Sequence, residues 1–466
     1  MEGNKKYINC FDININKLDE KKKDNSRQSE LIQKFQKVKL NHSYSKIINI
    51  ILFEIIFISL IKGRHLSYEH YIEINVYKAG YNQIISDEYR GTLPSKVLIN
   101  DAPLFMDNKV VLVAQTDYKI KLKWDNTLSN LSYMFSNLDT IRKVYIYYMF
   151  GNNCNMSYMF YNCHNLIKID YSSDYTKSNM IRDMSGMFYN CTSLISFQFT
   201  NLFINAYDRV QKSEKVGNET RTYWISYYYY SNLSYMFYNC NNLNSISFDS
   251  QELRYISDMK GMFYNCFSLR YLDLSQIKTN SYVDLSYMFY NCTNLVSFEN
   301  NGFHAKNMEY MFYNCISLKN INIGFFSLKY CHERDNNADS LICKYYENNN
   351  PITINIDYYW VNMAYLFYNC TKLENIEGSF NNFHISDIQE MFYNCISLKI
   401  LYFNPYYIIN ANMAKLFYNC QRIERITLIS SVKCYPNSLY LTFYNCISLM
   451  SLEISNIQTD YVEDII

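Results

Sequence analysis

The sequence predicts an α/β solenoid: a curved, right-handed coil with parallel strands on one face and short helices on the other, closed at its start by a small β domain. Three observations lead to this prediction. One short string recurs along roughly the last 340 residues, the hydrophobic period changes once within each copy, and no break in composition divides that region.

The repeat is centred on strings such as MSGMFYNCTSLISFQF and MKGMFYNCFSLRYLDL. Its copies begin at Met134, Met159, Met187, Met236, Met262, Met288, Met311, Leu366, Met391, Leu416 and Thr442. Most steps between copies are 23–28 residues long, and each of the two longer steps holds about one extra period. The spacing therefore predicts about 11 coils over residues 127–466, with insertions near 200–230 and 324–360.

Each copy combines two hydrophobic periods. The first half has apolar residues at i, i+3, i+4 and i+7, which is the stripe of a short helix; in one copy these are Met259, Met262, Phe263 and Cys266. The second half alternates, as at Leu272 and Leu274, which is typical of a strand with one face inward. One short helix and one short strand cannot bury their apolar faces alone, so the coils are expected to stack.

Ten cysteines occupy the last position of the helical stripe. They are Cys163, Cys191, Cys240, Cys266, Cys292, Cys315, Cys370, Cys395, Cys420 and Cys446. In the first copy Leu138 takes this position, which indicates that the site needs volume rather than sulfur chemistry. We expect a core ladder of buried thiols, with disulfides between neighbouring coils as the alternative. No paired C-x-x-C framework is present, so no metal or cofactor is predicted.

Two polar residues precede each cysteine. The asparagine, as in Asn190, Asn265 and Asn291, lies at the predicted helix exit, where a left-handed backbone conformation suits it and it can bond free backbone groups between coils. The tyrosine, as in Tyr189 or Tyr264, is expected to stack along the edge of the solenoid with its hydroxyl in water.

The signature M-x-x-M-F-x-N-C-x-x-L resembles the BspA-type leucine-rich repeats and the related mycoplasma lipoprotein repeat of unknown function. The resemblance covers about residues 127–466. It implies a leucine-rich-repeat solenoid and a surface-exposed or secreted role in adhesion and recognition. The chain departs from the pattern in its two insertions and in showing no C-terminal anchor.

Two segments precede the N-terminal β region. Residues 1–46 are polar and are expected to be disordered. Residues 47–62 contain IINIILFEIIFISLI, an apolar run too short for a ~30 Å hydrocarbon core and closer to a signal or signal-anchor segment. Lysines before the run favour export of the repeats, with membrane attachment through residues 47–61 if the run is not cleaved; a buried helix is the alternative.

The remaining flanks are expected to cover the ends of the solenoid. Residues 65–126 contain YIEINVY, SKVLIND, KVVLVAQ and YKIKLKW, which read as three or four strands of an N-terminal β cap. The last residues, ISNIQTDYVEDII, begin like a connector between coils and stop part-way. Either these residues form an irregular cap or the chain is truncated.

The insertions are the best places for modification. Cys331 and Cys343 lie off the core phase in one insertion and form the candidate disulfide if the chain is exported. Asn218 lies in the other insertion and is the candidate glycosylation site.

A row of outward residues on the strands is the candidate concave binding face. Its members are Asp170, Gln198, Asp273, Glu299, Asn322, Glu377, Tyr402 and Glu453. The row is polar, mildly acidic and evenly spaced, which suits a protein or glycan partner. Nucleic acid is not expected, because 44 basic and 43 acidic side chains leave a net charge of only +1.

Enzymatic activity is not predicted. The chain has no phosphate-binding G-x-x-x-x-G-K-[ST], no H-E-x-x-H and no G-x-S-x-G motif, and none of its seven histidines recurs at one repeat position. The sequence therefore predicts a non-enzymatic cell-surface or secreted binding protein. The alternative is an intracellular (cytoplasmic) scaffold for protein–protein interactions built on the same solenoid.

Overall fold

The computed structural model separates residues 1–68 from a second compact unit, residues 69–466. The structure describes residues 70–458, apart from gaps at 100, 108, 114–117, 148–149, 173–180, 200–205, 217–218, 248–255, 278, 280–281, 301, 327–340, 348–349, 357–359, 382 and 409–411. The polar tail 1–46 and the apolar segment 47–62 lie outside the described residues, so what was expected of them stays a prediction.

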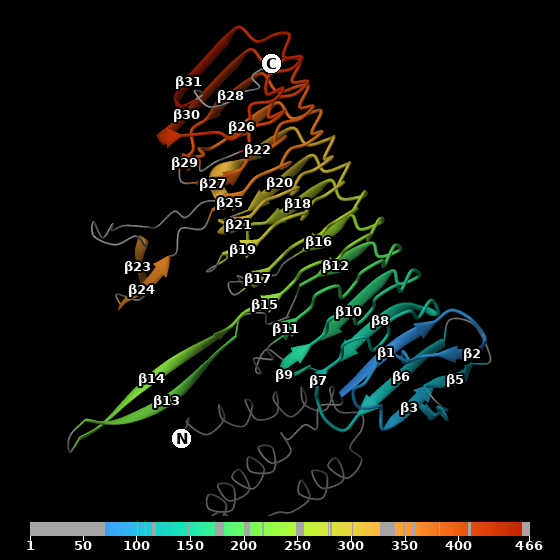
Figure 1. The fold of residues 1–466 in the computed structure, drawn as a ribbon. Coiled ribbons are helices and arrows are strands. Elements are labelled where there is room, and N and C mark those ends of the chain that lie inside the picture. The colour runs from blue at the N-terminus through green and yellow to red at the C-terminus, as the bar shows by residue number, and fades with distance from the viewer. Residues whose placement is uncertain are drawn as a thin grey trace, which may run out of the picture. The chain divides into compact units, whose positions relative to one another are not determined.

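The second unit is a parallel β-solenoid of about nine turns with a small sheet at its N-terminal end (Figure 1). Successive turns contribute strands to two rows, as Figure 1 shows. The first row is one ten-stranded parallel sheet, and its strands are β7 (Leu128–Asn130), β9 (Phe150–Asn155), β11 (Ile181–Asp183), β15 (Ser231–Asn232), β17 (Ile256–Asp258), β19 (Val283–Asp284), β21 (Ala305–Asn307), β25 (Val361–Asn362), β27 (His384–Asp387) and β29 (Tyr407–Ile408).

The second row contains the strands predicted from the leucine alternation. They are β8 (Ile141–Tyr147), β10 (Lys168–Ser172), β12 (Ser196–Gln198), β16 (Ser245–Ser247), β18 (Tyr271–Leu274), β20 (Ser297–Asn300), β22 (Asn320–Asn322), β26 (Asn375–Glu377), β28 (Ile400–Phe403), β30 (Arg425–Cys434) and β31 (Ser451–Ile457). Neighbours pair in parallel, in groups of two or three strands rather than as one continuous sheet.

The N-terminal sheet is continuous with the solenoid. Its strands are β1 (His70–Val76), β3 (Lys96–Ile99), β4 (Ala102–Pro103) and β6 (Tyr118–Trp124), and β2 (Gly80–Gln83) and β5 (Val110–Val113) form a separate antiparallel pair in the same region. Strand β1 pairs antiparallel with β6 on one side and with β8, the first strand of the second row, on the other. The solenoid therefore begins on a ready-made sheet edge, and its first coil is not left open.

Both insertions contain antiparallel hairpins. The first pairs β13 (Ala206–Val216) with β14 (Glu219–Tyr229), and the second pairs β23 (Leu341–Glu347) with β24 (Asn350–Ile356). Asn218 and Cys331 lie outside the described residues. The glycosylation site and the disulfide between Cys331 and Cys343 therefore remain predictions.

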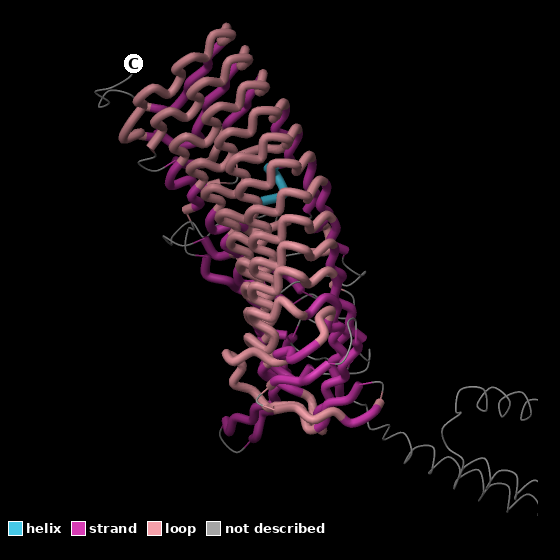
Figure 2. Tube along the Cα trace, turned by 90° about the vertical axis from the view of Figure 1, so that its right-hand side faces the viewer, coloured by secondary structure: helices cyan, strands magenta, loops and turns pink. Residues whose placement is uncertain are grey.

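The predicted short helices are wrong. Within the described residues the one helix is η1 (Ile323–Phe326), a four-residue 3-10 turn, and the FYNC segments form stacked turns (Figure 2). The reason is visible in the backbone: each segment holds two left-handed residues, such as Tyr287 and Asn291 with φ of 59° and 61°. An α-helix cannot contain such residues, although the apolar spacing imitates one.

Hydrogen bonds in these turns alternate between two directions. The N–H groups of Tyr287, Phe289 and Asn291 donate to carbonyls of the next coil at 3.0, 2.8 and 2.7 Å. The N–H groups between them, on Met288 and Tyr290, close turns within their own coil at 3.1 Å each. Every second backbone donor thus ties one coil to the next, as in a sheet, while the others bend the chain.

Because of the same alternation, equivalent side chains of successive coils stack in columns. The signature phenylalanines, from Phe135 to Phe443, stack on one another with ring centroids 5.3–5.7 Å apart. The neighbouring tyrosines, from Tyr189 to Tyr444, stack at 4.3–4.7 Å, which confirms the predicted tyrosine stack.

The asparagines form one continuous ladder of side-chain hydrogen bonds. Each amide nitrogen donates to the amide oxygen of the preceding coil, from Asn445 back to Asn137, at 2.5–2.9 Å. All of these residues are left-handed, as the sequence indicated. At the first coil the ladder ends on the N-terminal sheet, where Glu88 accepts from Asn137 at 3.1 Å and from Ser136 at 2.6 Å.

Replacing Asn291 tests what the ladder contributes. Asn291 donates to Asn265 at 2.8 Å and accepts from Asn314 at 2.6 Å. Because a hydrogen bond contributes about 1 kcal/mol, we expect Asn291→Gly to lower the free energy of unfolding by about 2 kcal/mol. Asn291→Ala should cost at least ~1 kcal/mol more, because alanine is strained at this φ and glycine is not. Urea unfolding followed by circular dichroism measures both; equal stabilities for the two variants would contradict the backbone contribution.

Candidate binding face

The outward side chains of the second strand row form the candidate binding face. The predicted residues lie on eight of its strands: Asp170 on β10, Gln198 on β12, Asp273 on β18, Glu299 on β20, Asn322 on β22, Glu377 on β26, Tyr402 on β28 and Glu453 on β31. Asp170 and Asn322 are half-buried and the other six are exposed. Inward neighbours such as Leu272 and Phe298 fill the core, so the alternation of the strands sets which residues face out.

The strand register brings some of these residues side by side. Asp273 lies opposite Glu299, and Asn322 lies opposite Glu377, so each pair occupies neighbouring coils at the same level. Tyr402 and Glu453 lie on either side of Thr427. No register joins Asp170 or Gln198 directly to another predicted member: Asp170 faces Tyr145 and Gln198 faces Ser247.

Three of the predicted polar groups also have local structural partners. Lys168 lies 2.9 Å from the carboxylate of Asp170. Asp273 accepts the N–H of Ser275 at 2.8 Å, and Asn322 accepts the N–H of Gly324 at 3.0 Å. Glu299, Glu377 and Glu453 carry no side-chain bond to the described residues, so their carboxylates are available to a partner.

The sequence analysis missed the apolar part of the face. Tyr271 is 62% exposed and Ile400 is 57% exposed, each at the start of its strand, beside the polar row. Exposed aromatic residues on a rigid sheet are typical anchors for protein partners. The signal was in the sequence, because Tyr271 and Ile400 alternate with buried residues and lie two positions before predicted members of the face.

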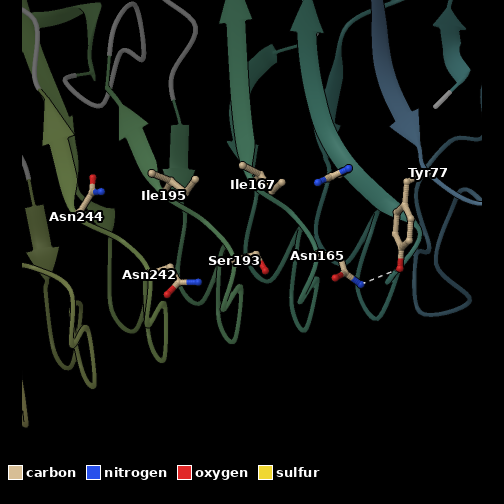
Figure 3. A pocket seen from close by; sticks show the side chains of 8 residues that line it. Tyr77, Asn165, Ile167, Ser193, Ile195, Asn242 and Asn244 are labelled. Atoms are coloured by element: carbon tan, nitrogen blue, oxygen red, sulfur yellow. Dashed lines mark hydrogen bonds between the residues drawn. The ribbon is translucent and has the colours of Figure 1, made fainter.

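The sequence analysis also missed a pocket at the N-terminal end of the face (Figure 3). It has a volume of about 600 Å³ and is lined by Tyr77, Arg142, Asn165, Ile167, Ser193, Ile195, Asn242 and Asn244. The lining is built by two neighbouring columns of the repeat. Asn165, Ser193 and Asn242 come from the turns after three cysteines, while Ile167, Ile195 and Asn244 lie just before three strands of the second row.

The N-terminal sheet completes the pocket. Tyr77 directly follows β1, and its hydroxyl accepts a hydrogen bond from the amide of Asn165 at 3.0 Å (Figure 3). The same amide donates to the carbonyl of Asp139 at 3.0 Å, which fixes its orientation and leaves its oxygen free. The pocket therefore exists only where the repeat meets the preceding sheet.

A sequence profile of the BspA type leucine rich repeat region matches this chain in six copies, over residues 119–215, 226–333 and 352–464. The chain belongs to the BspA-type leucine-rich repeat family. The resemblance read from the M-x-x-M-F-x-N-C signature is thereby confirmed. Members with this scaffold are commonly surface binding proteins and typically lack catalytic activity.

Other comparisons add little. The chain is similar to a leucine-rich repeat protein from Bacteroides ovatus with a solved crystal structure, at 15% sequence identity and a TM-score of 0.28, covering 78% of this chain and 94% of that one. At this TM-score the likeness supports no conclusion about the present chain. No curated protein matches it.

The described part of this BspA-type chain contains neither a candidate metal site nor a candidate membrane-spanning helix. No group of three or more histidine, cysteine, aspartate or glutamate side chains between residues 70 and 458 is placed to hold a metal ion, as far as those residues are described. No helix among the same residues reaches the length and apolar character of a membrane span.

The recurrent cysteines lie in the core and act as hydrogen-bond donors. Nine of the ten thiols are buried and Cys446, in the last coil, is partly buried; none is bonded to another. Each thiol donates to the carbonyl of the phenylalanine in the preceding coil at 2.9–3.2 Å, as Cys266 does to Phe237.

This geometry corrects the interpretation that the cysteine site needs volume alone. Each phenylalanine carbonyl already accepts the N–H of the cysteine in its own coil, as Phe263 accepts from Cys266 at 3.1 Å. The next thiol, Cys292, donates to the second lone pair of the same oxygen at 3.0 Å. Leu138 lies in the first coil, and no signature phenylalanine precedes that coil. A thiol at this position would have no phenylalanine carbonyl to donate to, so leucine is tolerated there.

Burial of the thiols makes stability depend on pH. It raises the pKa of Cys292 from its ordinary 9.0 to about 12 and raises the pKa of Cys266 as well. Because the folded state holds the proton more tightly, this stabilisation is complete below pH 9 and is lost as pH rises from 9 towards 12. Between pH 9 and 10 each thiol should lower the free energy of unfolding by up to about 1.4 kcal/mol.

We expect the variant Cys266→Ala/Cys292→Ala to flatten this pH dependence by about one proton at pH 9, where each of the two thiols is half ionised in the unfolded chain. Urea unfolding at pH 8.0, 8.5 and 9.0 gives the slope below the range where tyrosines titrate strongly. Leu269→Ala/Leu295→Ala is the matched control, because it removes buried volume from the same two coils without removing a thiol. An equal slope in the cysteine variant and the parent would contradict the assigned role of the buried thiols.

Proposed function

We propose that this protein is a non-enzymatic surface or secreted binding and adhesion protein that presents the second strand row to a protein or glycan partner. The observation that carries the proposal is the face itself: exposed carboxylates and aromatic side chains held at fixed spacing by strands whose inner residues, such as Leu272 and Phe298, pack into the core. A partner meeting such a face does not have to order it first, which lowers the entropic cost of binding.

The rigid framework supports a binding role more than a catalytic one. Glu299 and Glu377 are exposed on a regular surface, and neither lines the pocket at the N-terminal end of the face, where a reacting group would be better shielded from water. The pocket that is present is lined by amides, hydroxyls, apolar side chains and one guanidinium, without a carboxylate or an imidazole. These groups recognise ligands but do not transfer protons near neutral pH.

The alternative function is an intracellular scaffold that assembles proteins on the same face. The exposed Tyr271 and Ile400 suit a protein partner in any compartment. The twelve cysteines that the structure describes as free are compatible with a reducing compartment, but buried thiols without neighbours in bonding geometry also survive oxidising conditions. The two functions therefore differ in location, and that difference can be measured.

Charge reversal on the face tests the binding site. We expect Glu299→Lys/Glu377→Lys/Glu453→Lys to reduce retention of host or neighbouring cells by beads carrying the full chain at least tenfold, because three unpaired carboxylates become repulsive to the same partner. Asp273 is left intact because its carboxylate holds the N–H of Ser275.

The matched control reverses three exposed carboxylates that lie off the face. These are Asp87, Asp101 and Asp107, which lie in turns and loops around the N-terminal sheet. The control should retain cells like the parent. Equal losses in both triple variants would show an effect of net charge alone, and unchanged retention in the first variant would reject this face as the binding site.

Location is tested with an epitope tag after residue 466, in the cells that make the protein. A surface protein should lose the tag when intact cells are treated with protease, while a cytosolic marker stays uncut. Complete protection of the tag, with recovery of the full-length chain in the soluble cytosol, would reject the surface function and support the scaffold.

A further inference from the structure

We propose that the pocket at the junction of the N-terminal sheet and the first coils binds a short saccharide that carries a carboxylate, with Arg142 receiving the acid. The proposal rests on the proposed binding function and names the ligand class for one end of the same face. Three features support it: the conformation of Arg142, the charges around the pocket, and the polar groups of the pocket that remain free.

Arg142 is turned outward by a β-bulge. In the pairing of β1 with β8, Asn75 faces Lys143 and Val76 faces Ile141, so Arg142 has no partner in the register. Two successive residues, Arg142 and Lys143, are consequently exposed where the strand otherwise alternates. Bulges often redirect a side chain at a functional site. Here the bulge directs a guanidinium to the pocket, while the Arg142 carbonyl still accepts the N–H of Ile167 at 2.9 Å.

The guanidinium of Arg142 makes no ion pair or hydrogen bond with the described residues, and no carboxylate lines the pocket. Lys143 is exposed beside it and lies in register with Lys168, whose charge is engaged by Asp170 at 2.9 Å. This end of the face is therefore positive although the rest of the row is acidic. A carboxylate, like a phosphate, binds a free guanidinium with two parallel hydrogen bonds.

The other polar groups of the pocket match sugar hydroxyls. Asn242, Asn244 and Ser193 have no side-chain hydrogen bond to the described residues, and Asn165 has a free amide oxygen. Amides and hydroxyls offer donors and acceptors side by side, as hydroxyl groups on a ring do. The three turn residues follow one another from coil to coil, about 4.8 Å apart, which spaces them along a chain of sugar units rather than around a single point.

Ile167 and Ile195 give the pocket an apolar floor. Ile195 is 44% exposed, and Figure 3 shows both side chains beside the row of polar turn residues. The C–H face of a sugar ring can cover them while its hydroxyls reach the amides. A peptide would need partners for its backbone amides, and the strands beside the pocket already use backbone groups in pairing with one another, β8 with β1 and β10, and β12 with β16.

The test measures binding of the full chain to two acidic saccharides by isothermal titration calorimetry. The probes are 3′-sialyllactose and a disaccharide containing glucuronic acid, with lactose and the corresponding neutral disaccharide as controls. At least one acidic probe should bind ten times more tightly than its neutral counterpart. Arg142→Ala should raise its Kd at least tenfold, and Asn242→Asp should also raise it by placing a carboxylate in the pocket.

Arg425→Ala is the matched control, since Arg425 is also exposed on the second strand row, at the start of β30. It should leave the Kd unchanged, and circular dichroism melting curves should show that all variants keep the parent fold. Equal effects of Arg142→Ala and Arg425→Ala would overturn the pocket as the site. Binding of neither acidic probe, or equal binding of acidic and neutral probes, would overturn the ligand class.

A peptide outcome is also decisive. If acetylated tetrapeptides with a free carboxylate bind at Arg142 more tightly than either saccharide, the saccharide assignment is overturned. These failures are distinguishable from failure of the proposed function. Retention of cells by the parent chain and its loss on reversal of Glu299, Glu377 and Glu453 would persist without any saccharide in the pocket.

Discussion

The structure depends on one constraint: every second backbone N–H in the turn segment donates to the next coil, and the N–H groups between them close turns within their own coil. A chain that must do both within seven residues cannot remain helical. It needs residues that tolerate positive φ at two fixed places, which is why asparagine and, before it, tyrosine or glycine recur there. At Gly186 and Gly261 the ring of a tyrosine from the preceding coil lies where a Cβ would be. Glycine at this position therefore makes room for the tyrosine of the coil before it.

Once the backbone is fixed, the side chains have little freedom left. Stacking identical coils places phenylalanine on phenylalanine and asparagine on asparagine, and each carbonyl of a phenylalanine is left with one lone pair facing the next coil. A small buried donor is the group that can use this lone pair, and cysteine supplies it without the desolvation cost of a hydroxyl. The asparagine ladder adds direction, because every amide donates towards the N-terminus. A ladder of this kind needs an acceptor at its start, and Glu88 provides it from outside the repeat.

Most of the repeat could be predicted from the sequence, and the exceptions have physical causes. The alternation at Leu272 and Leu274 gave the correct strand, and the left-handed asparagine followed from its position. The helix at Met259–Cys266 was wrong because apolar spacing reports which side chains face inward and not which hydrogen bonds hold them there. The ten-stranded sheet was missed because strands of two to six residues, such as Val283–Asp284, are too short to show a period. The pocket could not be predicted from the sequence, because it depends on a bulge at Arg142 and on Tyr77, which lies outside the repeat.

Regular repeats make a rigid face, but such a face distinguishes poorly between ligands, because each coil presents the same side chains as its neighbour. Specific recognition is therefore expected where the regularity fails. Three of the described departures from the repeat lie at the N-terminal junction: Leu138 replaces cysteine, Glu88 replaces asparagine, and Arg142 leaves the strand register. The first two follow from the need to start a ladder. The bulge at Arg142 is different, because the pairing of β1 with β8 would be complete without it. A departure that the packing does not require, and that exposes an unpaired charge beside free amides, is better explained by a ligand than by the fold.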